Sequence, residues 1–360
     1  MDLLEKYSLR FLTIKGANPL KPTIFAKVIY ATSIISYFVL TASLIYCIIF
    51  TITEIAHVID NVTGIAILYQ AITKEMDLFV NRQKYRHVID CLDKFWSEDK
   101  FGRVAQKKVK DIRLITVTFI QIYICLLVFA TVWCYFKIVL LQGTILPWTW
   151  ISFCEVENNY CYVYTYTAQS LCITWVMMGI LYYDTMSLLL LASAYQEFEQ
   201  IKYAFCILPI DETVDGDDGD VLEFIGIIVK QHNLVLEFIK EIGNLLSTIL
   251  VSLIVTIILI VCASLFLSSN TGFSPSTSLR IVPYIVGALG EMFLYCVAGQ
   301  LIINQSLSVA DAAYASKWWV KKQPGLRKAI CLVIQRAQRN SQIAAVGILN
   351  LDLNTFVAVR

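Results

Sequence analysis

YCVAGQLIINQSLSVADAAYASKWW, residues Tyr295–Trp319, is the stretch that decides how this chain folds. It begins as the end of an apolar run of membrane length and turns polar at Asn304–Gln305. It then continues with helix-forming residues as far as two tryptophans, and Pro324–Gly325 follows as a stop signal. The pattern predicts one helix that leaves a bilayer and continues into water.

The composition agrees with a membrane protein. Of 360 residues, 58% are hydrophobic and 16% are charged, and the mean hydropathy is +0.65. Such a chain is too apolar for a water-soluble globule and is typical of an all-α polytopic membrane protein. The net charge of +1 gives no indication of a nucleic-acid partner.

Six apolar runs are long enough to cross a bilayer, and a seventh is shorter. We expect them to form one domain over residues 1–360. The expected spans are 28–50, 55–80, 112–141, 167–195, 242–267 and 281–303, with a partial seventh at 343–360.

The basic residues predict the orientation. Loops 1–27, 81–110 and 311–340 hold most of the lysines and arginines, whereas the alternate loops 51–54, 142–166 and 268–280 hold only Arg280. By the positive-inside rule the N-terminus is cytoplasmic. This is opposite to a G-protein-coupled receptor, and the Asp-Arg-Tyr and Asn-Pro-x-x-Tyr motifs of that class are absent from the sequence.

No arrangement of residues indicates an enzyme, a cofactor or a metal site. The three histidines fall in different loops, and neither a Walker motif nor a Ser/His/Asp arrangement occurs. The acidic segment Asp211–Asp220 has Leu222 where a calcium loop needs glutamate, so we interpret it as a disordered cytoplasmic loop. A disulfide between Cys154 and Cys161 stays open, because it requires an extracellular loop.

Two carboxylates, Asp184 and Glu291, lie within predicted spans. They either line a pore or ligand cavity, or they make hydrogen bonds between helices. The second interpretation is favoured because Thr185 and Ser187 follow Asp184 and predict a polar packing face. The aromatics near the predicted outer ends fit an interfacial belt, and a few of them fit an apolar pocket that opens outward.

Three groups of residues carry a resemblance to the insect odorant receptor family. The first group is in the sixth span: Cys296, Gly299, Ser306, Ala310, Tyr314 and Trp318. The second precedes the fifth span: His232, Leu236, Phe238 and Ile239. The third is near the end: Ile334–Gln338, Ala345, Gly347, Leu351 and Phe356. The first two thirds of the chain resemble the family in architecture alone.

The resemblance implies a cation channel gated directly by odorant. Its four subunits surround one pore in the plasma membrane of an olfactory sensory neuron dendrite, where a tuning receptor joins a shared co-receptor as a hetero-tetramer within membrane lipid. It also implies a cytoplasmic anchor at about 196–241 and 304–340, and a final helix that lines the pore and here carries Ile348, Leu351 and Phe356. The ligand would bind in the outer half of the bundle, between helices two, three, four and six. At that depth the candidates are Phe129, Trp133, Phe136, Tyr166, Ser170, Met177 and Tyr284.

The end of the chain departs from the family pattern, which continues past the position of Val359. As a helix, Ile343–Arg360 would reach about 27 Å, short of a core of about 30 Å. We therefore expect an incomplete receptor with a defective gate. A gustatory receptor of the same superfamily is the nearer alternative, and a G-protein-coupled receptor is the alternative from another class.

Overall fold

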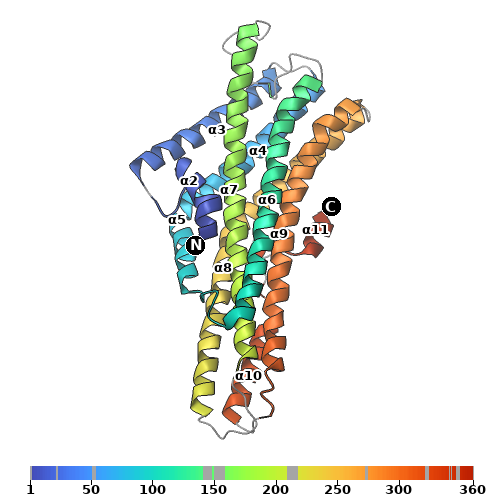
Figure 1. The fold of residues 1–360 in the computed structure, drawn as a ribbon. Coiled ribbons are helices and arrows are strands. Elements are labelled where there is room, and N and C mark those ends of the chain that lie inside the picture. The colour runs from blue at the N-terminus through green and yellow to red at the C-terminus, as the bar shows by residue number, and fades with distance from the viewer. Residues whose placement is uncertain are drawn as a thin grey trace.

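The computed structural model describes residues 2–21, 23–50, 54–140, 148–149, 159–208, 218–271, 275–320, 324–339, 341, 343–345 and 349–359. Long helices make up most of this part of the chain (Figure 1). The elements are α1 (Asp2–Leu4), the π-helical turn η1 (Glu5–Leu9), α2 (Arg10–Ile14), α3 (Ile24–Phe50), α4 (Ile55–Val80), α5 (Arg82–Cys91), the 3-10 turn η2 (Leu92–Lys94), α6 (Gly102–Leu140), α7 (Asn159–Cys206), α8 (Asp218–Thr271), α9 (Pro275–Ala315), α10 (Pro324–Ala337), β1 (Ala344–Ala345), β2 (Leu349–Asn350) and α11 (Leu353–Val359).

Within the described residues, six helices are long and apolar enough to cross a membrane: α3, α4 and parts of α6, α7, α8 and α9. They correspond to the six predicted spans. Four of them, α6 to α9, form a column of long, roughly parallel helices, and α3 lies to one side of it (Figure 1). With 54 residues, α8 is about 80 Å long, far more than the bilayer core of about 30 Å. The column therefore extends well beyond one membrane thickness.

The core of the column lies along α7, which packs against α4, α6, α8 and α9. The large side chains of Tyr183, Phe198 and Phe205 on α7 are fully buried, and they share one cluster with Val235 and Ile249 on α8. These contacts reach past the predicted end of the fourth span at residue 195. The helix continues because residues 196–206 keep an apolar stripe at helical spacing.

Three of the predicted spans are parts of longer helices in the structure. The predicted fourth span, 167–195, lies within a helix that begins at Asn159 and ends at Cys206. Residues 159–166 of the predicted loop 142–166 are therefore helical. The fifth span belongs to a helix over Asp218–Thr271. The anchor ranges 196–241 and 304–340 are thus largely continuations of α7, α8 and α9, together with α10. Their cytoplasmic side remains a prediction.

The helix of the opening stretch ends earlier than its sequence predicts. α9 stops at Ala315, and Lys317 adopts a left-handed conformation with φ of 57°. Such a residue is a common helix terminator. Pro324 begins α10, a first-turn position that suits its fixed φ, so it starts the next helix and does not end α9.

The predicted partial seventh helix over 343–360 is also wrong. Ala344 pairs with Asn350 and Ala345 with Leu349 as antiparallel partners, and among the described residues of this range only Leu353–Val359 is helical. The Thr355 amide donates to Asp352 Oδ1 at 2.8 Å, which caps the helix start. The segment lies beside α9 (Figure 1).

The N-terminal residues, predicted as a basic loop, are folded into the bundle. Phe11 stacks on Tyr182 of α7 with ring centroids 4.1 Å apart, and Ser8 Oγ donates to the Tyr182 carbonyl at 2.9 Å. Lys15 Nζ forms an ion pair with Glu75 of α4 and donates to the Trp175 carbonyl at 2.9 Å. Residues 2–15 therefore help to hold α4 and α7 together.

Candidate functional site

A cavity of about 80 Å³ lies among α4, α6, α7, α8 and α9. Its walls are mainly aliphatic; these residues include Ile67, Leu127, Val176, Ile180 and Ile260. On the α9 side the small residues Gly287 and Ala288 leave room for the cavity. A Cβ placed on Gly287 would meet no atom within 4 Å.

Pro283 also lines the cavity from inside α9. Proline has no backbone N–H, so the hydrogen-bond ladder of the helix is interrupted at this level. The interruption lies between the predicted outer end of the span and Glu291. α9 therefore has a local weak point where it borders the cavity.

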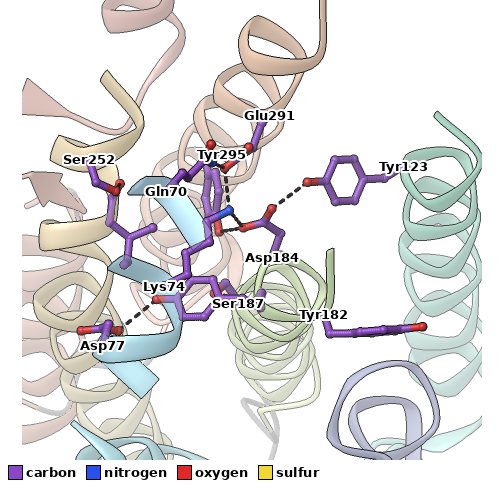
Figure 2. Close-up of polar contacts among 12 residues, drawn as sticks. Gln70, Lys74, Asp77, Tyr123, Tyr182, Asp184, Ser187, Ser252, Glu291 and Tyr295 are labelled. Atoms are coloured by element: carbon purple, nitrogen blue, oxygen red, sulfur yellow. Dashed lines mark hydrogen bonds and ion pairs between the residues drawn. The ribbon is translucent and has the colours of Figure 1, made fainter. Parts of the chain in front are cut away.

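The floor of the cavity is polar and is made by Gln70 of α4 and Glu291 of α9. Gln70 Nε2 donates to the two carboxylate oxygens of Glu291 at 2.5 and 2.7 Å. Lys74, one helical turn after Gln70, donates to Glu291 Oε1 at 2.7 Å (Figure 2). Residues four apart share a helix face, so α4 presents both donors to α9.

Lys74 also joins α7 to this floor. Its ammonium donates to Asp184 Oδ1 at 2.6 Å, and its side chain is 0% exposed. Asp184 accepts further hydrogen bonds from Tyr123 at 2.7 Å and from Tyr295 at 2.8 Å (Figure 2). We call Lys74, Asp184 and Glu291 the central charge cluster. It links α4, α6, α7 and α9, because the tyrosines come from α6 and α9.

The side chains of Lys74 and Asp184 are fully buried and that of Glu291 is 8% exposed, so the charges of the cluster depend on one another. A buried ion that loses its partner typically destabilises a protein by about 3–5 kcal/mol. The favoured interpretation of Asp184 and Glu291, polar contacts between helices, is confirmed by these bonds. Glu291 also lines the cavity, so the alternative interpretation, a residue that lines a ligand cavity, stays open for it.

Sequence reasoning missed Lys74 as the shared partner. A lysine within a predicted span does not by itself identify its partners. The available signal was spacing: Gln70, Lys74 and Asp77 recur at helical intervals on one face. Asp77 makes a second polar group one turn away, where it accepts from Tyr85 at 2.5 Å and from Tyr183 at 3.1 Å.

The structure places the predicted ligand-binding residues in different environments. Met177 and Tyr284 line the cavity. Tyr166 is half-buried and stacks on Tyr162, with ring centroids 6.0 Å apart, and Ser170 is half-buried outside the cavity lining. Phe129 is a correction: it is 63% exposed on the outside of α6, and Leu127 and Thr131 face the cavity in its place. The side chains of Trp133 and Phe136 lie outside the described residues.

The residues that carried the family resemblance hold neighbouring segments against α9. Cys296 is fully buried, and a Cβ on Gly299 would lie 2.1 Å from the Leu351 carbonyl oxygen. Ser306 Oγ accepts from the Ser341 amide at 3.3 Å. Further contacts are Tyr314 on Trp319 at 5.3 Å, Trp318 on Trp319 at 6.2 Å and His232 on Phe198 at 6.1 Å between centroids.

The predicted pore residues also pack within the single chain. Leu351 is 2% exposed against α9, and Phe356 packs edge-on against Phe293 at 5.3 Å between centroids. Ile348 lies outside the described residues. Cys161 is disulfide-bonded, and Cys154 lies outside the described residues, so the predicted pairing stays a prediction. In the part of the chain that the structure describes, no group of three or more His, Cys, Asp or Glu side chains is arranged to hold a metal ion.

Comparison with known proteins gives one consistent result. A family model described as 7tm Odorant receptor matches residues 54–360. Odorant receptor 22c of Drosophila melanogaster is 26% identical over 136 residues, which are 38% of this chain and 33% of that protein. The odorant receptor coreceptor of Aedes aegypti is 24% identical over 131 residues, which are 36% of this chain and 27% of that protein. The matched stretches thus span about a third of the curated relatives' own length.

A solved structure extends the likeness to the whole fold. The insect olfactory receptor OR5 from Machilis hrabei, in complex with eugenol, matches with a TM-score of 0.81 at 16% identity. The match covers 99% of this chain and 94% of that chain. At this identity it establishes a common fold.

Proposed function

Because this chain belongs to the insect 7tm odorant receptor family, we propose that it is a receptor subunit that binds a small volatile odorant and gates a non-selective cation channel. The family assignment selects an odorant receptor over the gustatory alternative and over the G-protein-coupled class.

The observation that carries this proposal is the cavity itself. It is lined by residues of five helices, its walls are mainly apolar, and Gln70 and Glu291 form one polar end. Small-molecule sites typically combine apolar walls with a few placed polar groups. The protein of the same fold from Machilis hrabei was solved with eugenol, a small aromatic molecule, which supports a ligand of this size class.

Gating would pass through α9, which borders the cavity and also holds the C-terminal segment. Glu291 is at the cavity floor, and Gly299, two turns further along α9, contacts Leu351. A ligand that changes the tilt or bend of α9 at Pro283 would therefore change the position of residues 351–359. This contiguous path supports coupling between ligand and channel.

The partner and the location follow from the family. We propose a hetero-tetramer with the odorant receptor co-receptor, in the plasma membrane of an olfactory sensory neuron dendrite. The matches to two Aedes co-receptors support common ancestry with that partner. The basic loops before and after the first two spans support a cytoplasmic N-terminus.

The experiment is whole-cell current at clamped voltage from this chain co-expressed with the co-receptor, challenged with an odorant panel under G-protein blockade. Gly287→Phe should remove the odorant current, because the ring would occupy the open space at this position. Gly290→Phe is the matched control: Gly290 is exposed on the same helix outside the cavity lining, and its Cβ would also meet no atom. Currents that require G-protein signalling, or that persist in Gly287→Phe, would contradict the proposal.

A further inference from the structure

We propose that the cavity floor selects ligands by a hydrogen-bond donor, so the preferred odorants are small, mostly apolar molecules that carry one donor such as a hydroxyl group. The donor would bind the Glu291 carboxylate. This inference rests on the proposed ligand site and adds the chemical class of its ligand.

The central charge cluster carries more negative than positive charge. One ammonium, on Lys74, faces two carboxylates, on Asp184 and Glu291. The cluster therefore has one formal negative charge in excess, and its three side chains are almost wholly buried. A buried carboxylate is stabilised by each hydrogen bond donated to it, and such charge-assisted bonds are about twice as strong as neutral ones.

Of the two carboxylates in the cluster, Glu291 has room for another donor. Asp184 already accepts from Lys74, Tyr123 and Tyr295, and its side chain is 1% exposed. Glu291 accepts only from Lys74 and Gln70 among the hydrogen bonds of the described residues, and its side chain is 8% exposed. The remaining open face of Glu291 belongs to the cavity lining.

In the described part of the chain, the cavity floor offers a ligand hydrogen-bond acceptors and no free donor. The Nε2 group of Gln70 donates to both oxygens of Glu291, and Lys74 lies fully buried beneath them. On the walls, Thr131 donates to its own helix at the Leu127 carbonyl, 2.8 Å away. The other donors of the lining lie away from the floor: Tyr284 is two turns before Glu291 on α9, and Trp148 precedes α7. A ligand that carries only an acceptor, such as an ether, would bring its oxygen against a carboxylate and gain no bond at the floor.

The test uses isomeric ligands, one of each pair with a donor and one without: 1-hexanol against methyl pentyl ether, and 2-phenylethanol against benzyl methyl ether. Dissociation constants are measured on the full chain in lipid nanodiscs from tryptophan fluorescence, since Trp148 lines the cavity. A hydrogen bond to a charged group should make each alcohol bind about 10- to 100-fold more tightly than its ether.

Two variants should change the ratio of the ether dissociation constant to the alcohol dissociation constant in opposite directions. Glu291→Gln keeps the shape and leaves one ammonium facing one carboxylate, so the ratio should fall to about threefold. Gln70→Met removes the competing donor, so the ratio should rise by about threefold or more. Glu199→Gln is the control, because Glu199 is also a buried, lysine-paired carboxylate, but it lies outside the cavity lining. It should leave the ratio unchanged.

Each outcome is decisive. Opposite shifts in the two floor variants, with no shift in the control, support the inference, and a purely structural role would not reverse the sign. Equal affinities for alcohols and ethers in the unchanged chain overturn the donor inference but leave the proposed odorant site standing. If neither member of any pair binds to a chain that unfolds cooperatively, both the inference and the proposed ligand site fail.

Discussion

Two buried lysine–carboxylate clusters differ in their access to water. The central charge cluster has two carboxylates for one ammonium, and the side chain of Lys74 is 0% exposed. The second cluster lies at Glu199 of α7, which pairs with Lys108 and Lys202 at 2.6 Å each and accepts a hydrogen bond from Gln305. We call these four residues the Glu199 cluster.

The Glu199 cluster has the opposite imbalance, with two ammonium groups for one carboxylate, but the Lys108 side chain is 54% exposed. Water can hydrate its excess charge, whereas nothing but protein surrounds Lys74. The comparison indicates that solvent access, and not the number of ion pairs, sets how strongly each cluster depends on its members.

The largest expected effect is therefore at Lys74. Lys74→Met removes the shared cation and leaves two buried carboxylates facing each other, which should cost about 3–5 kcal/mol of stability. Thermal unfolding of the purified chain and its level at the cell surface measure the loss. Adding Asp184→Asn and Glu291→Gln to the same chain should restore most of it. If the stability of the Lys74→Met variant lies within about 1 kcal/mol of the parent, the contrast between the two clusters is contradicted.

A smaller effect tests whether a close contact without charged groups is equally sensitive to substitution. In Gly299→Ala the new Cβ would lie 2.1 Å from the Leu351 carbonyl oxygen, so the C-terminal segment must move. We expect a loss of about 1–3 kcal/mol. Gly290→Ala, on the same helix with open space at its Cβ, should gain up to about 1 kcal/mol from helix propensity. Equal thermal midpoints for the two variants would contradict the described contact.

The smallest effect is expected in the Glu199 cluster. Lys108→Ala leaves Lys202 and Gln305 bound to Glu199, so the stability should change by less than about 1 kcal/mol. The change should shrink further in high salt, because an exposed charge is screened. Thermal unfolding at two salt concentrations measures it. A loss as large as that of Lys74→Met would mean that water does not reach this cluster.

Much of this fold follows from hydrophobicity and charge along the chain. The six long spans and the polar contacts of Asp184 and Glu291 were predictable, because a carboxylate in an apolar helix requires a partner. The partner Lys74 was not, because one sequence does not give the rotation of α4 relative to α7 and α9.

The unknown rotation of each helix also explains why only some of the predicted ligand-binding residues line the cavity. Depth along the helix placed Met177 and Tyr284 near the cavity, but it also selected Phe129. Successive helix positions differ by about 100°, so Leu127 and Thr131 face inward while Phe129 faces outward. α6 is apolar on most sides at this level, so its sequence carries no signal that fixes the rotation. At the end of the chain, Asp352 lies inside the predicted span 343–360, whereas in the structure it caps the start of a shorter helix.

Because α9 is long, a small tilt at its cavity end displaces its other end. From Glu291 to Ala315 the helix runs unbroken for about 36 Å. If its cavity end tilts by about 3°, the far end at Ala315 is displaced by about 2 Å, roughly the size of an atom. A displacement of that size at α10, which packs against α9, is larger than the tolerance of a close-packed contact. A molecule of a few carbon atoms can thus produce a movement of about one atomic diameter at the other end of the receptor.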